Sequence, residues 1–158
     1  MKKLVTLRNV LKACAVLLGL VAFFLMFGDQ AYWRSGDTVS FLKFDKALFG
    51  GETILGNYKG AVISFVGYLL IALAAIAVCV LVFLPLDAKI KKFVNLGLGF
   101  VLVLGAIFVF IVGAAFNNAN GIDYWHAAFC PIFAGILAII GGLLVCGSEF
   151  APDKQLLK

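Results

Sequence analysis

The residues of this chain best suited to acid–base or metal chemistry are its single histidine, His126, and the carboxylate three positions before it, Asp123. An Asp and a His at that spacing can touch on a helix. An enzyme acting on lipid at a membrane surface would need both groups to converge with a further loop acid, such as Asp29 or Asp37. The pair has no additional ligands or neighbouring nucleophile, so we expect Asp123 to cap the following helix. No catalytic residue, metal site or cofactor is predicted.

The cysteines also lack the spacing of a reactive site. No two of them form a C-x-x-C pair, the arrangement that thiol redox relays and many zinc sites use. We expect them to be small apolar packing residues. They are Cys14, Cys79, Cys130 and Cys146.

Charged side chains inside apolar segments mark ion pathways, because a charge in a bilayer costs at least about 2.5 kcal/mol. The apolar segments 61–84, 93–116 and 127–147 contain no Lys, Arg, Asp or Glu. Lys12, at the edge of the first apolar segment, is expected to extend toward the lipid headgroups. This pattern disfavours a pump or an ion-coupled transporter. A passive pore or the membrane subunit of a transporter is the alternative function that it leaves open.

Composition indicates a membrane protein. Hydrophobic residues make up 64% of the chain and charged residues 13%, and the mean hydropathy is +1.11. With 158 residues, four bilayer-crossing segments leave no room for a soluble catalytic domain. The predicted fold is therefore an all-α membrane protein, a single four-transmembrane-helix bundle. Its spans are expected at residues 10–27, 61–84, 93–116 and 127–147.

The positions of the basic residues predict the orientation. The N-terminus, the connector 85–92 and the C-terminus contain nine of the Lys and Arg residues, and the loops 28–60 and 117–126 contain four. By the positive-inside rule, both termini are expected in the cytoplasm and both loops outside a cell membrane. The net charge of +5 then needs no nucleic acid as a partner. The first span is expected to remain uncleaved, because no small-x-small cleavage site follows it.

The external loop 28–60 is expected to contain a short β-strand or hairpin. Residues 38–41 alternate between polar and apolar types after a turn sequence at 35–37. Residues 44–49 place apolar side chains at helical spacing and predict a brief amphipathic turn, which two glycines would end. A second extended piece is expected over 53–58. The aromatic residues beside the spans are expected to be membrane-interface anchors, namely Tyr32, Trp33, Tyr124 and Trp125.

Small residues at helical spacing predict where the spans touch. Lipid provides no hydrophobic drive for helix association, so close packing depends on residues that let backbones approach. Because every span has such a stripe, we interpret the stripes as the seams of one left-handed bundle rather than as a homo-oligomer interface. The predicted packing residues are Gly19, Gly105, Gly113, Ala134, Ala138 and Gly142, joined by Ala15, Ala75, Cys79, Gly97 and Cys146.

The layout is similar to that of the claudin-like tetraspan proteins. It shares four spans, a long first external loop with expected strands, and a short second loop. Trp33 and Leu48-Phe49-Gly50 resemble the tryptophan and the Gly-Leu-Trp sequence of that family's first loop, in a different order. The paired loop cysteines of the family are missing, so the resemblance implies a layout and no functional residue.

The external loop is the predicted functional element, because the spans contain no chemistry. We expect a non-enzymatic scaffold or accessory subunit in the lipid bilayer, whose loop binds another membrane or envelope protein or a second copy of this chain. Aromatic residues and arginine supply most of the binding energy at protein interfaces. The predicted partner-binding residues are Trp33, Arg34, Phe41, Phe44 and Phe49.

Overall fold

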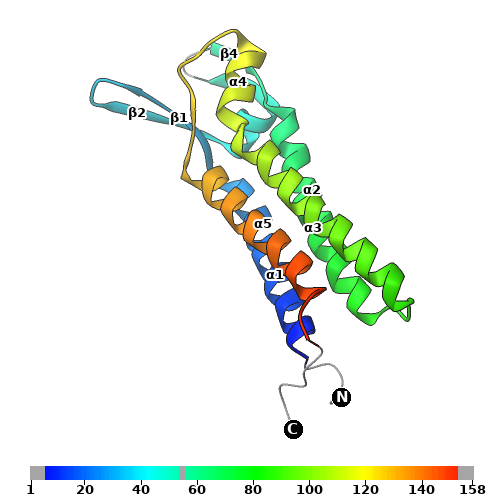
Figure 1. Cartoon of the computed structure of the whole chain (residues 1–158). Coiled ribbons are helices and arrows are strands. Elements are labelled where there is room, and N and C mark those ends of the chain that lie inside the picture. The colour runs from blue at the N-terminus through cyan, green and yellow to red at the C-terminus, as the bar shows by residue number, and fades with distance from the viewer. Residues whose placement is uncertain (1–5, 54–55, 153–158) are drawn as a thin grey trace.

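The computed structural model describes residues 6–53 and 56–152. Four of its helices are long and apolar enough to cross a membrane, as the sequence predicted. They pack in a ring, in which α1 and α3 each contact both α2 and α5 (Figure 1). The four helices are α1 (Leu7–Phe24), α2 (Val62–Phe83), α3 (Ala88–Phe110) and α5 (Phe129–Ser148).

The shorter elements gather at one end of the bundle, which we call the sheet end (Figure 1). A three-stranded antiparallel sheet has the order β2-β1-β5, and β3 pairs with β4 in a separate hairpin. The opposite end, where the described chain begins and finishes, is the terminal end. The shorter elements are η2 (Leu25–Phe27), β1 (Asp29–Ser35), β2 (Thr38–Lys43), η3 (Asp45–Phe49), β3 (Gly50–Thr53), β4 (Gly56–Lys59), α4 (Val112–Asn120) and β5 (His126–Ala127).

The predicted hairpin is confirmed in the first loop. Ser35 pairs with Thr38 across a two-residue turn, and Gly36 has a positive φ of 59°, which suits the first turn position of a type II′ hairpin. The following turn η3 is π-helical and buries Ala47 and Leu48. Gly50 and Gly51, the two glycines that were predicted to end this turn, are also the first residues of β3. Residues 54 and 55 of the predicted second extended piece lie outside the described residues.

The third apolar helix begins earlier than the sequence predicted. It starts at Ala88, inside the expected connector 85–92, because the carboxylate of Asp87 accepts a hydrogen bond from the Lys89 amide and caps the helix. The helix changes direction at Ile111, and α4 then continues to Asn120, inside the expected loop 117–126. Gly121 ends α4 in the left-handed conformation, with φ of 66°.

The expected helix cap at Asp123 is wrong. Helix α5 begins at Phe129, with Ala128 as its cap, and β5 precedes it. The amide of Ala128 donates to the carbonyl of Gln30 at 3.0 Å, which extends the pairing of β5 with β1. The backbone before α5 is therefore a strand, and Asp123 and His126 do not lie on one helix.

Glycines bring the helix backbones into direct contact. A Cβ on Gly142 of α5 would lie 2.6 Å from the carbonyl oxygen of Gly99 on α3. A Cβ on Gly105 of α3 would lie 2.8 Å from the carbonyl oxygen of Gly67 on α2. Both distances are shorter than a real Cβ contact, so any larger residue must push the helices apart. These two crossings fix the position of α3 between its neighbours.

The structure buries all six of the main predicted packing residues, and Gly113 lies against β5 rather than against another long helix. Gly19 meets Ala75, where an added Cβ would lie 2.8 Å away. A Cβ added at Gly97 would meet no atom within 4 Å, and Cys79 is exposed, so neither residue packs at a helix crossing. The sequence prediction did not include Gly67, Gly99 or Gly141, which do lie at crossings.

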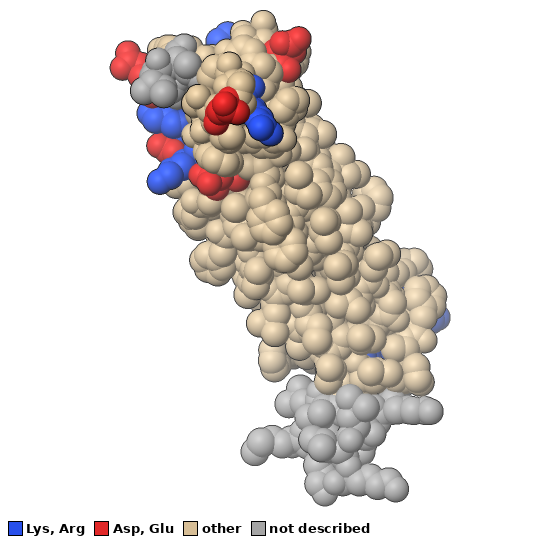
Figure 2. Space-filling view, turned by 90° about the vertical axis from the view of Figure 1, so that its left-hand side faces the viewer, with Lys and Arg blue, Asp and Glu red and all other residues tan. Residues whose placement is uncertain are grey.

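The flanks of the bundle present an uncharged surface. In Figure 2 the Lys, Arg, Asp and Glu side chains gather at the sheet end, and the long body below them is almost free of them. Large apolar side chains point outward there, with Phe83 72% exposed and Phe93 75% exposed. This distribution is the one that a helix bundle surrounded by lipid requires.

Candidate functional site

Strand β2 has an open edge. Among the described strands it has a neighbour on one side only, namely β1. The closing pair of a two-residue hairpin, here Ser35 and Thr38, is hydrogen-bonded, and bonded pairs then alternate along the ladder. The backbone N–H and C=O groups of Val39 and Phe41 therefore point away from β1. An edge of this kind is a template for another strand.

The open edge of β2 is bordered by exposed apolar side chains. Val39 is 45% exposed and Phe41 is 55% exposed, and both lie on the same face as Lys43. Leu42, on the opposite face, is buried. Figure 1 shows the β1–β2 hairpin extending sideways from the bundle, so its edge is accessible to a neighbouring molecule.

The structure divides the predicted partner-binding residues into two groups. The Trp33 ring packs 5.6 Å from that of Tyr124, and the Phe44 ring packs 5.1 Å from that of Phe27, so both attach the loop to the rest of the protein. The Phe49 ring also contacts the bundle, 4.8 Å from the Phe65 ring.

Arg34 and Phe41 remain exposed on the β1–β2 hairpin. The Arg34 Nε group donates a hydrogen bond to the carbonyl of Gly36 at 3.2 Å. The hairpin is therefore one exposed part of the loop, and Trp33 and Phe44 attach it to the rest of the protein. Phe49 of η3 contacts the bundle on one side and is also 53% exposed.

Three of the four predicted interface anchors, Trp33, Tyr124 and Trp125, form one aromatic cluster, and Tyr32 contacts other rings. Trp125 is only 2% exposed and packs against Phe116, so its ring is enclosed by protein and does not reach a headgroup layer. Tyr32 is half-buried beside His126. The hydroxyl groups of Tyr124 and Tyr58 lie 3.2 Å apart, and this hydrogen bond, with partial burial, raises the pKa of Tyr58. The cluster fastens β4 and β5 together above the bundle.

Two asparagines of α4 each bind a neighbouring backbone by two hydrogen bonds. Asn117 donates to the carbonyl of Trp125 at 2.8 Å and accepts from its amide at 3.1 Å. Asn120 does the same with Lys59, accepting at 2.6 Å and donating at 2.8 Å. Through these two side chains, helix α4 binds the backbone at Trp125, before β5, and at Lys59, at the end of β4.

Replacement of Asn117 by alanine is expected to lower the free energy of unfolding by about 1–3 kcal/mol, because both backbone groups of Trp125 lose their partners in a partly buried place. Thermal unfolding in detergent, followed by tryptophan fluorescence, measures this loss. Asn118→Ala is the matched control, since Asn118 is exposed on the same helix. Equal melting temperatures for the two variants would contradict the assigned role of Asn117.

The structure places two of the groups considered for a lipid-hydrolysing site, His126 and Asp37, at different positions along β1. His126 pairs with Tyr32 of β1, and Asp37 lies in the hairpin turn at the far end of that strand. Within residues 6–53 and 56–152, no group of three His, Cys, Asp or Glu side chains is placed to hold a metal ion.

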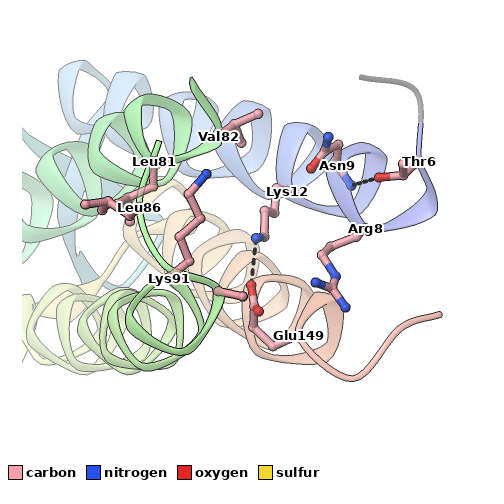
Figure 3. A pocket seen from close by; sticks show the side chains of 10 residues that line it. Thr6, Arg8, Asn9, Lys12, Leu81, Val82, Leu86, Lys91 and Glu149 are labelled. Atoms are coloured by element: carbon pink, nitrogen blue, oxygen red, sulfur yellow. Dashed lines mark hydrogen bonds and ion pairs between the residues drawn. The ribbon is translucent and has the colours of Figure 1, made fainter. Parts of the chain in front are cut away.

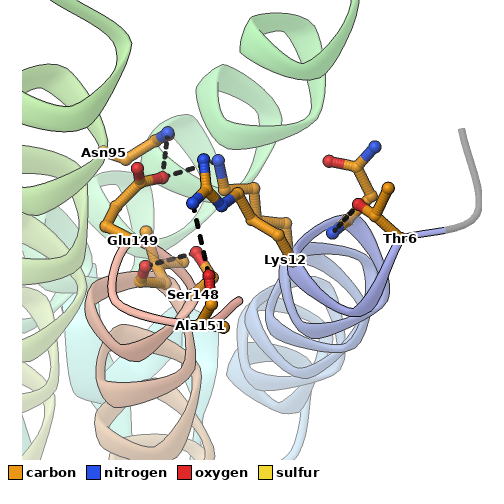
Figure 4. Close-up of polar contacts among 9 residues, drawn as sticks. Thr6, Lys12, Asn95, Ser148, Glu149 and Ala151 are labelled. Atoms are coloured by element: carbon orange, nitrogen blue, oxygen red, sulfur yellow. Dashed lines mark hydrogen bonds and ion pairs between the residues drawn. The ribbon is translucent and has the colours of Figure 1, made fainter. Parts of the chain in front are cut away.

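A buried ion pair lies at the terminal end, where the sequence indicated only a lysine extending toward lipid headgroups. That expectation is wrong, because Lys12 is 6% exposed and its Nζ lies 2.6 Å from Oε1 of Glu149, which follows α5 (Figure 4). The Asn95 side chain donates to the same carboxylate oxygen at 2.7 Å. The sequence signal was a lysine at the start of the first apolar segment and an acid two residues after the last.

A second buried polar contact joins the sheet to the helices. The fully buried Gln30 donates to the carbonyl of Met26 at 2.9 Å and accepts from the Tyr68 hydroxyl at 2.8 Å. Gln30 thereby caps the end of the first span and fixes β1 to α2. Sequence reasoning missed it because Gln30 is an ordinary loop residue by type.

Comparisons of the chain with protein-family models, with curated proteins and with solved structures give no match.

Proposed function

We propose that this protein is a non-enzymatic scaffold of a cell membrane, which associates with a second copy of itself through the open edge of β2. The observation that supports the proposal is the edge of β2, which no other described strand pairs with and which exposed Val39 and Phe41 border on a hairpin that projects from the bundle. The distribution of basic residues supports cytoplasmic termini, which would place the hairpin outside the cell.

The backbone of β2 restricts how two copies can pair. The groups that point outward belong to Val39 and Phe41, so an odd-numbered residue must oppose an odd-numbered residue of the partner. With Ser40 on the two-fold axis, Val39 opposes the partner's Phe41, and Asp37 lies beside the partner's Lys43. Each axis-related half then has one apolar pair and one pair of opposite charges, the kinds of cross-strand pair that stabilise sheets.

The two adjacent registers are less favourable. With Val39 on the axis, Phe41 opposes the partner's Asp37 and Lys43 opposes the partner's Ser35, so the charge pair is lost. With Phe41 on the axis, Lys43 opposes the partner's Val39, and Asp37 has no base opposite it. The Ser40-centred register is therefore the one that the side chains select. Two copies of the three-stranded sheet, joined through β2, would form one continuous antiparallel sheet of six strands.

Disulfide crosslinking tests this register. In a variant whose native cysteines are replaced by alanine, Ser40→Cys is expected to give a disulfide-linked dimer when native membranes are treated with copper phenanthroline, because facing Cβ atoms on the axis lie about 4.5–5.5 Å apart. The readout is the mobility on a non-reducing gel.

Thr38→Cys is the matched control on the same strand. Its two copies would be separated by four residues, about 13 Å, and should not crosslink. Absence of a Ser40→Cys dimer, or equal crosslinking at Thr38, overturns the register.

A photoreactive residue at position 41 separates the possible partners. Self-association predicts an adduct of twice the chain mass, with no adduct from a control at Phe100, which is exposed on α3. An adduct with a different protein from position 41 retains a scaffold role and rejects self-association. No adduct at position 41 rejects the hairpin as the interaction site.

A further inference from the structure

Two adjoining cavities lie between α1 and α2 at the terminal end. The first is polar, with a volume of about 270 Å³. The second is apolar, with a volume of about 470 Å³, and runs along the two helices. Asn9, Lys12 and Val82 line both cavities, so the two spaces lie next to each other.

The polar cavity has an excess of positive charge. Its charged lining residues are Arg8, Lys12, Lys91 and Glu149. Glu149 neutralises Lys12 through the 2.6 Å ion pair, which leaves Arg8 and Lys91 without an acid in the lining. Figure 3 shows Lys12, Lys91 and Glu149 extending into the space enclosed by α1, α3 and the end of α5.

The Arg8 guanidinium uses few of its hydrogen-bond donors within the described structure. One Nη2 bond, 3.3 Å long, goes to the carbonyl of Ala151. The Nε atom is buried and has no hydrogen-bond partner within the described structure. Because Nε is enclosed by protein, a ligand in the cavity would meet the Nη groups of this lining residue, whose geometry suits a planar or tetrahedral oxyanion such as phosphate.

The apolar cavity extends from this charged space toward the middle of the spans. Its wall is made of Val16, Leu17 and Phe83, together with small residues. Leu17 is 63% exposed and Phe83 is 72% exposed, so the groove is open on the side that faces lipid. A hydrocarbon chain can therefore enter it laterally from the bilayer.

We propose that this site binds an anionic phospholipid, with its phosphate at Arg8 and Lys91 and one acyl chain in the α1–α2 groove. The cationic space lies at the end of the spans, where headgroups are found, and the groove follows the direction of the chains. Basic pockets between membrane helices hold anionic headgroups in this way. A free phosphate ion would occupy the polar cavity alone, whereas a phospholipid would occupy both the polar cavity and the apolar groove.

Native mass spectrometry of the protein in uncharged detergent tests the proposal. Phosphatidylglycerol is expected to remain bound at lower concentrations than phosphatidylcholine. Arg8→Gln with Lys91→Gln is expected to weaken phosphatidylglycerol binding about thirtyfold, the effect of removing two basic residues near a headgroup. Lys89→Gln with Lys92→Gln is the control, because it removes the same charge from the same end but outside the cavity lining. The control should bind as the unmodified chain does.

A second variant tests the groove without changing any charge. Ala13 is an exposed residue of the groove wall, and Ala13→Leu narrows the groove. Weaker phosphatidylglycerol binding by this variant supports an acyl chain in the groove. The proposal is overturned if the two lipids bind equally, if both pairs of charge variants weaken binding equally, or if inorganic phosphate displaces the lipid.

Discussion

Lys12→Met is expected to lower the free energy of unfolding by about 3–5 kcal/mol, the cost of leaving one member of a buried ion pair without its partner. Glu149 would lose its ion-pair partner while it stays 8% exposed, and the amide of Asn95 would remain as its hydrogen-bond donor. Lys12→Met combined with Glu149→Gln should recover most of the loss, because a neutral amide oxygen can still accept from Asn95. Reversible unfolding in mixed micelles, followed by circular dichroism, measures all three proteins.

Lys92→Met is the control for this pair of variants. Lys92 is an exposed lysine of the same end and lies 4.7 Å from the centre of the Phe150 ring. Its loss should cost about 1 kcal/mol or less, the value of an exposed cation–π contact. If the single and double variants at Lys12 and Glu149 were equally unstable, the ion pair would not be the cause.

Gly142→Ala is expected to destabilise the bundle by about 1–3 kcal/mol or more, although alanine is a better helix former than glycine. The new Cβ would meet the Gly99 carbonyl at 2.6 Å, and backbone atoms cannot rotate away. Helices α3 and α5 must therefore separate and lose contact along their length. The same unfolding measurement detects the change.

Gly97→Ala on α3 is the control, and it is expected to change the stability in the opposite direction. Nothing lies within 4 Å of its added Cβ, so the substitution should stabilise the helix by up to about 1 kcal/mol. Destabilisation by both substitutions would show that glycine is needed for a reason other than close approach.

The apolar helices and the hairpin could be predicted because local sequence determines them. Uninterrupted apolar segments fix the four helices, and the alternation before Leu42 with a glycine turn fixes β1 and β2. The expected cap at Asp123 failed because β5 is only two residues long and forms through β1, almost a hundred residues earlier. Such a strand has no local pattern, since its pairing partner determines it.

The candidate sites were less predictable for a related reason. Phe41 and Phe44 are identical by type, yet one is exposed on the hairpin and the other packs against Phe27. Only the tertiary structure distinguishes them. Lys12 was misjudged because the sequence places it at a span boundary, while its burial depends on Glu149, at the opposite end of the chain.

The unequal edges of the three-stranded sheet limit the size of an assembly. β2 offers six residues at its open edge, whereas β5 is two residues long and has Gly113 of α4 packed against its backbone. Pairing of β2 with the partner's β2 is isologous, so it uses the same surface on both copies and leaves no open β2 edge for a third copy. An assembly built on this edge therefore closes as a dimer with point-group symmetry and does not grow into a filament.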